Sequence, residues 1–165
     1  MGGKKLLVVT DRGGHLHDAL RLMGQMEICP NFLVTTEGPD VDYLKKNPEL
    51  KAAEVFTVPQ SFFWIGKKRV WSPFRFLKLF FKSLHIVLRT RPDIVISTGA
   101  TNVVYTCLIA KLFGSTLVHV ENLAQVKNAS VTGRILYPFA DHFFVQWKDL
   151  LDQYGPKAQF AGWVI

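Results

Sequence analysis

Short apolar runs recur along the chain and are separated by segments long enough to form helices. The runs lie at 6–10, 32–36, 55–58, 93–98, 116–121, 142–146 and 158–162. They are continuous and rich in β-branched and aromatic residues, which is typical of strands covered on both faces. Segments of helical composition lie between them at 15–26, 74–89, 102–113 and 130–139. This alternation predicts an α/β fold, a Rossmann-like doubly wound parallel sheet with right-handed crossovers.

The segment 59–73, PQSFFWIGKKRVWSP, departs from this pattern. It is too apolar for an ordinary solvated loop and too rich in glycine, proline and charge for a strand. We therefore expect an irregular connection, and long connections of this kind are more often functional than plain tethers.

Length and composition predict one folded domain over 1–165, with 48% hydrophobic and 20% charged residues. The net charge of +7 favours a polyanionic partner: nucleic acid, anionic lipid or a phosphorylated ligand. No uncharged apolar stretch reaches about 18 residues, so any membrane contact is expected to be peripheral. Cys29 and Cys107 share no CxxC spacing and look like small buried hydrophobic residues of a reduced protein.

The helical segment 74–89 carries a stripe of basic residues spaced three and four apart: Arg75, Lys78, Lys82, His85 and Arg89. Its other positions are apolar except for one serine, and no acid lies between Glu54 and Asp93. Together with the aromatic and basic residues before it, this predicts a membrane-associating insert at about 60–89 that binds an anionic lipid surface. The membrane-binding residues would be Phe62, Phe63, Trp64, Lys67, Lys68, Arg69, Trp71, Arg75, Lys78 and Lys82. A calmodulin-target or nucleic-acid-binding stripe is the alternative, but no recognition motif supports nucleic acid as a partner.

The loop TDRGGH at 10–15 follows the first strand and opens the first helix. Glycines let the backbone approach a ligand, and a helix N-terminus presents free N–H groups, so this is a candidate site for phosphate or diphosphate. It is neither GxGxxG nor GxxxxGK[ST], so the ordinary dinucleotide and P-loop interpretations fail. A tight turn without a ligand is the alternative. His15 there could act as a general base or hold a phosphate, whereas His17 and Asp18 are expected to point outward.

Two further loops follow predicted strands, STGATN at 97–102 and HVENLAQV at 119–126. The carboxyl ends of parallel strands lie at one edge of a sheet, so these loops are expected to line one crevice with the first. Glu121 is a candidate base or an acceptor for substrate hydroxyls, and capping the next loop is its alternative role. The histidines and acids lack metal-ligand spacing, so no metal or other cofactor is expected.

Together these motifs resemble those of a known enzyme family. GGH after the first strand, PDIVISTGA, HVENLAQV and DHFFVQW are similar to the amino-terminal domain of GT-B glycosyltransferases of the MurG type. They are more similar still to bacterial PssD/CpsF-type polysaccharide-biosynthesis proteins. The eukaryotic counterpart of these is the membrane-anchor subunit, number fourteen in the asparagine-linked glycosylation series. The similarity runs from about Lys5 to the last residue.

The resemblance implies half of a two-component enzyme. One polypeptide would bind the membrane and a lipid-linked sugar acceptor, and a partner would supply the carboxyl-terminal half that holds the UDP-sugar. The reaction implied is an inverting sugar transfer to a polyprenyl-diphosphate-linked acceptor, in polysaccharide biosynthesis at the cytoplasmic face of the plasma membrane. The chain ends where a MurG-like enzyme would continue, so we expect a natural half-enzyme that is inactive without its partner. The alternative is a non-catalytic membrane scaffold that recruits and activates a separate, complete transferase.

The resemblance also suggests roles for individual residues. It assigns the acceptor diphosphate to the glycine-containing loops, with Arg12, Gly13, Gly14, Thr98 and Gly99. It leaves the catalytic base open among His15, Glu121 and Asp11. Asp11 and Arg12 stand where small residues are usual in the family, and Asn122 and Gln125 replace common serine and arginine positions.

Overall fold

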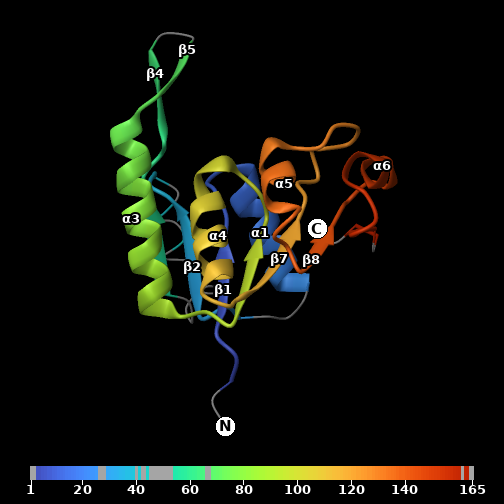
Figure 1. Ribbon diagram of the computed structural model, residues 1–165, viewed down its shortest axis with the longest axis horizontal. Coiled ribbons are helices and arrows are strands. Elements are labelled where there is room, and N and C mark those ends of the chain that lie inside the picture. Colours follow the sequence, from blue (N-terminus) through green and yellow to red (C-terminus); the bar gives the residue numbers. More distant parts are fainter. Residues whose placement is uncertain are drawn as a thin grey trace.

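A parallel sheet of seven strands lies at the centre of the described residues (Figure 1). The computed structural model describes residues 3–25, 29–39, 41, 44, 54–65, 68–160 and 162–163, with the backbone alone for 62–65 and 68–71. In sheet order the strands are β3 (Glu54–Val58), β2 (Phe32–Thr36), β1 (Leu6–Val9), β6 (Ile94–Ser97), β7 (Thr116–Val120), β8 (His142–Phe144) and β9 (Ala158–Gln159). The predicted fold class is confirmed.

The strand order reverses at the centre of the sheet. β1 pairs with β2 on one side, where Leu7 lies opposite Phe32, and with β6 on the other, where Leu7 lies opposite Val95. The chain therefore continues from β1 toward one edge of the sheet and from β6 toward the other, while the loops that follow these two strands lie side by side. Such a switch point is where open α/β sheets bind their ligands.

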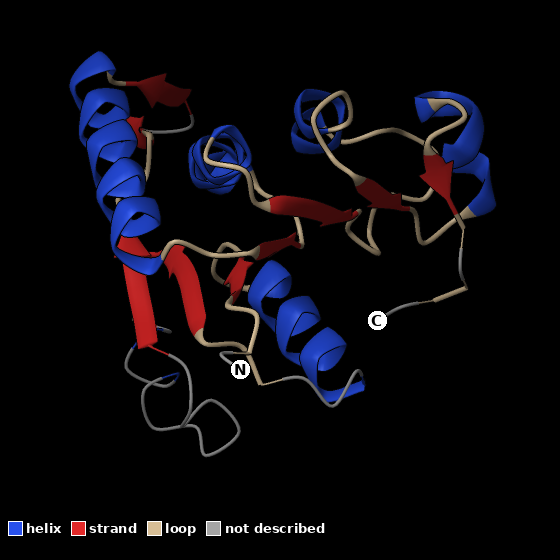
Figure 2. Cartoon of the chain, turned by 60° about the horizontal axis from the view of Figure 1, so that its bottom comes forward, coloured by secondary structure: helices blue, strands red, loops and turns tan. Residues whose placement is uncertain are grey.

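Helices cover both faces of the sheet, as Figure 2 shows. On one face lies α1 (Gly14–Gln25), and on the other lie α3 (Pro73–Thr90), α4 (Val104–Leu112) and α5 (Val131–Leu136). Short helical turns complete the described part: η2 (Thr101–Val103), η3 (Lys148–Leu150) and α6 (Leu151–Tyr154). Each sheet face has its own hydrophobic core, with Leu7 and Leu79 in one, and Val8 and Leu22 in the other.

The helices α1, α3, α4 and α5 agree with the prediction to within a few residues at their ends. The segment 148–154 was not predicted to be helical, because it is too short to show helical periodicity. β9 is shorter than the predicted strand 158–162, since it pairs with β8 only at Ala158 and Gln159. In the part of the chain that the structure describes, no helix is both long enough and apolar enough to cross a membrane.

The expectation of irregular structure at 59–73 was wrong. Residues Phe62–Ile65 form β4 and residues Lys68–Trp71 form β5, and the two pair antiparallel with Ile65 opposite Lys68. The prolines lie outside the paired strands, where they remove no ladder hydrogen bond. Figure 1 shows this hairpin projecting beyond the amino-terminal end of α3, past the carboxyl ends of the sheet strands.

Seven of the predicted membrane residues lie between positions 62 and 71 of the sequence, and their side chains lie outside the described part of the structure: Phe62, Phe63, Trp64, Lys67, Lys68, Arg69 and Trp71. The base of the hairpin is described. There the backbone N–H of Ser72 donates to Ser61 O at 3.4 Å, which closes the hairpin against the start of α3.

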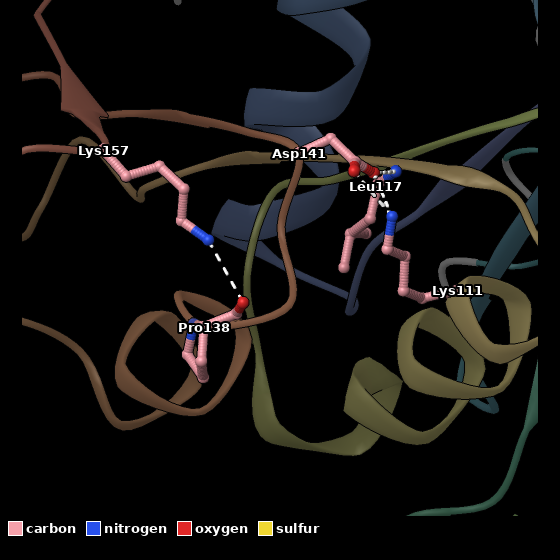
Figure 3. A network of polar contacts seen from close by, with 5 residues as sticks. All are labelled: Lys111, Leu117, Pro138, Asp141 and Lys157. Atoms are coloured by element: carbon pink, nitrogen blue, oxygen red, sulfur yellow. Dashed lines mark hydrogen bonds and ion pairs between the residues drawn. The ribbon is translucent and has the colours of Figure 1, made fainter.

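Polar contacts tie the helices to the sheet on the side of β7 and β8 (Figure 3). Lys111 of α4 donates to the two carboxylate oxygens of Asp141 at 2.6 and 2.7 Å, and the backbone N–H of Leu117 donates to the same group at 2.7 Å. Burial raises the pKa of Asp141, but the hydrogen bonds from Lys111 and Leu117 outweigh it and lower the pKa overall. Nearby, Lys157 Nζ donates to Pro138 O at 3.2 Å.

The two cysteines differ in exposure. Cys107 is buried in the core, as predicted, and burial raises the pKa of its thiol to about 12. Cys29 is exposed, so the interpretation of both as buried residues was wrong for this one. Cys29 lies in the connection before β2 and not within a packed element, which explains the difference.

Candidate functional site

Two strand-to-helix loops meet where the strand order reverses. The loop after β1 and the loop after β6 lie side by side because these strands pair directly. Thr98 Oγ1 donates to Thr10 Oγ1 at 3.0 Å and joins the loops, and both side chains are buried. Gly13 and Gly99 have φ angles of 72° and 100°, which other residues rarely adopt. The predicted convergence of the two glycine-containing loops is therefore confirmed.

His15 lies between these loops and the third loop, which follows β7. Its ring Nδ1 is 3.2 Å from Thr98 O and 3.0 Å from Asn122 Nδ2. A Cβ atom on Gly99 would lie 3.4 Å from the imidazole, which is an ordinary contact, so the positive φ rather than crowding favours glycine there. The ring is half-buried. All three predicted loops thus contact one another at His15.

Asp18 belongs to this group, and the expectation that it points outward was wrong. Asn122 Nδ2 donates to Asp18 Oδ2 at 3.1 Å. The reason is helical geometry, because residues three apart lie on the same side of a helix and Asp18 follows His15 by three. His17 is exposed, as expected.

Two pockets open beside His15. One has a volume of about 580 Å³ and lies at the start of α1, lined by Gly14, His15, Asp18, Asn122, Leu123, Ala124 and Gln125. The other has a volume of about 160 Å³, and its lining includes His15, Gly99, Glu121, Asn122, Gln125 and Ser130. His15, Asn122 and Gln125 line both. The first pocket therefore joins the start of α1, where a helix N-terminus favours an anion, with the His15 imidazole, the Asn122 amide and the Asp18 carboxylate.

Glu121 is fully buried, and its carboxylate accepts hydrogen bonds from three donors. The backbone N–H of Asn122 and the hydroxyl of Ser130 donate to it at 3.0 Å each, and the hydroxyl of Tyr154 donates as well. Ser130 is also the N-cap of α5 and accepts from the backbone N–H of Gly133 at 2.8 Å. Burial and the Glu121 carboxylate raise the pKa of Tyr154. These contacts favour the capping role of Glu121, in which it holds the start of α5 beside the pocket.

Asp11 is joined to the base of the hairpin through a buried amide. Its carboxylate accepts from the backbone N–H of Arg12 at 2.8 Å and from Asn102 Nδ2 at 3.1 Å. Asn102 is 2% exposed, and its Oδ1 accepts from the backbone N–H and the hydroxyl of Ser61 at 3.2 and 2.7 Å. Asp11 is thereby held against the loop and lines neither of the two pockets.

Arg12 is directed away from both pockets. Its guanidinium donates to Glu37 O at 3.3 Å. When the side-chain amide of Gln60 is oriented with its oxygen toward Arg12, this oxygen accepts hydrogen bonds from Arg12 Nε and Nη2 at 3.2 and 2.6 Å. Among the residues assigned to the diphosphate, Gly14 and Gly99 line the pockets, while Arg12 lies over the connection between β2 and β3.

Three polar residues of the site region were not assigned a role from the sequence: Asn122, Asn102 and His119. The resemblance had marked Asn122 only as an expected departure from a serine. His119 is fully buried against Phe143, and within the described residues neither of its ring nitrogens has a partner. Burial lowers its pKa to about 4; Glu121 raises it and His15 lowers it further. No three His, Cys, Asp or Glu side chains gather at metal-binding distances among the residues described.

The outward surface of α3 carries both basic and apolar residues. Phe74, Leu77 and Phe81 are 84, 55 and 57% exposed, whereas the side that faces the sheet includes the buried Leu79 and Ile86. The predicted basic stripe is present, but acids from other elements reach it. Lys82 pairs with Glu37 at 3.0 Å and Arg89 pairs with Glu54 at 2.6 Å. Counting acids along the sequence could not show these pairs.

Solved structures share the fold. MurG from Acinetobacter baumannii superposes with a TM-score of 0.69 and 20% identity, over 89% of this chain and 43% of that one. A UDP-N-acetylglucosamine 2-epimerase from Rickettsia bellii gives a TM-score of 0.67 and 13% identity, over 99% of this chain and 46% of that one. At these identities the likeness shows the fold alone. The chain spans less than half the length of either protein.

Similarity in sequence is more specific. Residues 6–164 match the family model described as oligosaccharide biosynthesis protein Alg14 like. The relative named UDP-N-acetylglucosamine transferase subunit ALG14 from Rattus norvegicus is 29% identical, over 97% of this chain and 82% of the relative. The proteins of the same name from Homo sapiens and Schizosaccharomyces pombe are 28 and 29% identical, over 97 and 96% of this chain and 82% of each relative. The chain thus belongs to the Alg14-like family of oligosaccharide biosynthesis proteins.

Proposed function

We propose that this single domain, residues 1–165, is the acceptor- and membrane-binding subunit of a two-component inverting glycosyltransferase. With its partner it transfers a sugar from a UDP-sugar to a polyprenyl-diphosphate-linked acceptor, in polysaccharide biosynthesis of the PssD/CpsF type. The observation that carries the proposal is a pairing of two findings. The chain corresponds to one half of a MurG-type structure, and its relatives are named as subunits of a transferase. A partner of GT-B carboxyl-terminal type then supplies the UDP-sugar site and forms a heterodimer.

The acceptor diphosphate is assigned to the larger pocket. Gly14 and His15 of the first turn of α1 line this pocket, and the partial positive charge of a helix N-terminus favours an anion. Gly14 leaves open space, because a Cβ atom there would meet no other atom within 4 Å. His15 lines both pockets, whereas Glu121 and Asp11 are held by structural hydrogen bonds. His15 is therefore the candidate best placed to contact the acceptor.

The hairpin and the exposed side of α3 are assigned to the cytoplasmic face of the plasma membrane as a peripheral contact. An amphipathic helix with exposed aromatic residues next to cations lies well in the lipid headgroup region. The base of the hairpin contacts Asn102, which contacts Asp11 of the first loop. Because of this connection, a hairpin on the bilayer would keep the candidate diphosphate site close to it. A lipid-linked acceptor would then not need to leave the membrane.

The test is sugar transfer by the reconstituted pair, with this chain and the UDP-sugar-binding half on vesicles that carry a polyprenyl-diphosphate acceptor. We expect His15→Gln to lower kcat/KM for the lipid-linked acceptor about tenfold or more, because glutamine does not reproduce the geometry of the imidazole's hydrogen bond to the charged acceptor. His17→Gln, on the exposed side of the same helix turn, is the matched control and should leave kcat/KM unchanged. Gly14→Ala should fold normally, since the space around it is open, and should raise KM by filling the ligand's place.

Two outcomes would overturn the proposal. Robust transfer by this chain alone would exclude the two-component arrangement. Full turnover by the Gly14, His15 and Glu121 variants, with membrane binding retained, would favour the scaffold alternative, in which this chain only recruits and activates a complete transferase.

A further inference from the structure

The side-chain amide of Asn122 is fixed in one orientation by two partners. Its Oδ1 accepts from the backbone N–H of Ala124 at 2.7 Å, and its Nδ2 donates to the carboxylate of Asp18 at 3.1 Å. Turning the amide over would set the oxygen against the Asp18 carboxylate and the NH₂ group against the Ala124 N–H. Both contacts would become repulsive, because an amide oxygen only accepts and an NH₂ group only donates.

This orientation determines what His15 meets. One N–H of Asn122 Nδ2 is used by Asp18, and the same nitrogen lies 3.0 Å from His15 Nδ1. If His15 Nδ1 carried a proton, that proton would face the second N–H of the Asn122 amide, and two donors would oppose each other. If Nδ1 carries a lone pair instead, it accepts a hydrogen bond from that second N–H. The carbonyl oxygen of Thr98, 3.2 Å from Nδ1, can only accept a hydrogen bond and therefore favours a proton on Nδ1. The Asn122 contact is the shorter one, and the carboxylate that accepts from the same amide polarises its N–H groups and strengthens the bond.

We propose that Asn122 is a positioning residue that holds His15 as the tautomer with its proton on Nε2. The described residues offer Nε2 no hydrogen-bond partner, and the ring lines both pockets. In this state His15 offers a ligand a hydrogen-bond donor and cannot accept a proton at Nε2. Resting on the proposed function, His15 then binds an oxygen of the acceptor diphosphate, and the role of base falls to another group.

The tautomer is measured directly by long-range ¹H–¹⁵N correlation spectra of the labelled full chain, at a pH where histidines are neutral. His15→Gln assigns the signal among the five histidines. We expect the Nε2–H pattern in the wild type. Asn122→Asp is nearly isosteric but can only accept, and Asn122→Ala leaves Thr98 O as the remaining partner, so both should convert His15 to the Nδ1–H pattern. Asn128→Asp, at an exposed position in the connection between β7 and α5, is the matched control and should leave the Nε2–H pattern of His15 unchanged.

Wild-type spectra with the Nδ1–H pattern would overturn the proposal, and so would unchanged Nε2–H spectra in both Asn122 variants. A purely structural role for Asn122 would not move the tautomer. Because the readout needs no substrate, partner or turnover, it decides the inference whether or not the proposed transfer reaction is correct.

Inorganic pyrophosphate provides the second readout. We expect Asn122→Ala and His15→Ala each to weaken its binding about tenfold, the usual order for losing a hydrogen bond to a charged group. The double variant should bind no more weakly than His15→Ala, because Asn122 acts through His15. If the losses of pyrophosphate affinity in the two single variants add up in the double variant, Asn122 does not act through His15. If the wild type binds no pyrophosphate while its spectra show Nε2–H, the assignment of the diphosphate fails and the tautomer assignment stands.

Discussion

Glu121, Asn102 and His119 are polar side chains near the site that are almost fully buried, and each is stabilised differently. Glu121 accepts from three donors, and Asn102 joins Asp11 to Ser61. His119, by contrast, has no partner for either ring nitrogen within the described residues. A buried polar group without a partner costs free energy, and a buried charge without one costs far more. His119 is therefore tolerated as a neutral ring packed at a tilt against Phe143, and its protonation is unfavourable.

This predicts a pH-dependent stability that His119→Leu removes. The pKa of His119 is lowered from 6.5 to about 4 in the folded chain, so between these values the unfolded chain binds a proton that the folded chain does not. Acidification across that window therefore favours unfolding, by about 3 kcal/mol for the whole interval. Urea unfolding of the wild type and of His119→Leu, at pH 7 and at pH 4, gives the difference between their free energies of unfolding at each pH. The change in that difference between the two pH values measures the effect. A difference that stays constant with pH would contradict it.

At the scale of the element, burial distinguishes the apolar residues of a helix that face the sheet from those that face outward, which the sequence does not. The pattern of 74–89 predicts a helix with one basic stripe, and α3 confirms both. It does not show which apolar residues face the sheet, because apolar positions occur all around this helix. The first turn of α5 is held by Ser130 and Glu121, which lie outside the helix. The hairpin β4–β5 was missed because its strands pair only with each other.

The first turn of α5 predicts opposite effects for one substitution at two glycines. A Cβ atom on Gly133 would overlap the hydroxyl of Tyr154 and the carboxylate of Glu121, so Gly133→Ala should destabilise the chain by about 1–3 kcal/mol. Gly24 lies in α1 with nothing within 4 Å of a new Cβ, so Gly24→Ala should stabilise by about 0.5–1 kcal/mol. Denaturant unfolding measures both free energies. Equal effects of the same sign at the two sites would show that the contacts of Gly133 do not matter.

At the scale of the whole molecule, segments far apart in sequence are brought to one end of the sheet. Ser61 before the hairpin, Asn102 in η2 and Asp11 after β1 are linked by hydrogen bonds. The hairpin and the exposed side of α3 therefore lie next to the loops of the candidate site. This proximity is a property of the sheet topology, since β1 and β6 are neighbours although 88 residues separate Leu6 from Ile94.

The distribution of exposed aromatic residues predicts which surface meets a membrane. Phe74 on α3 is 84% exposed and Phe139 after α5 is 49% exposed, so serine at either position should cost little stability. We expect Phe74→Ser to reduce co-sedimentation with anionic vesicles severalfold, because an aromatic ring at the headgroup boundary contributes apolar burial. Phe139→Ser is the matched control and should sediment like the wild type. An equal loss in both variants would exclude α3 as the specific contact. Higher salt should weaken binding further, since charges screen one another over about 10 Å at 0.1 M.

Much of the fold and part of the site could be predicted from local patterns. Continuous apolar runs predicted strands buried on both faces, and glycines after two of them predicted loops at the switch point. The contacts of individual side chains could not be predicted in this way. Asp18 meets Asn122 across 104 residues, and Lys82 meets Glu37 across 45. No local pattern specifies such pairs, because they depend on the strand order and on the side of each helix that faces the sheet.

The sequence by itself thus determined the α/β class, most of its strands and main helices, and the three loops that lie together. These features follow from hydrophobic periodicity and from glycine's backbone freedom, which act over a few neighbouring residues. Only the tertiary structure decided that Glu121 holds the start of α5, that Asp11 faces Asn102, and that Asn122 meets the ring of His15. Those contacts are set by packing between distant segments, where the position of one amide decides which nitrogen of an imidazole carries the proton.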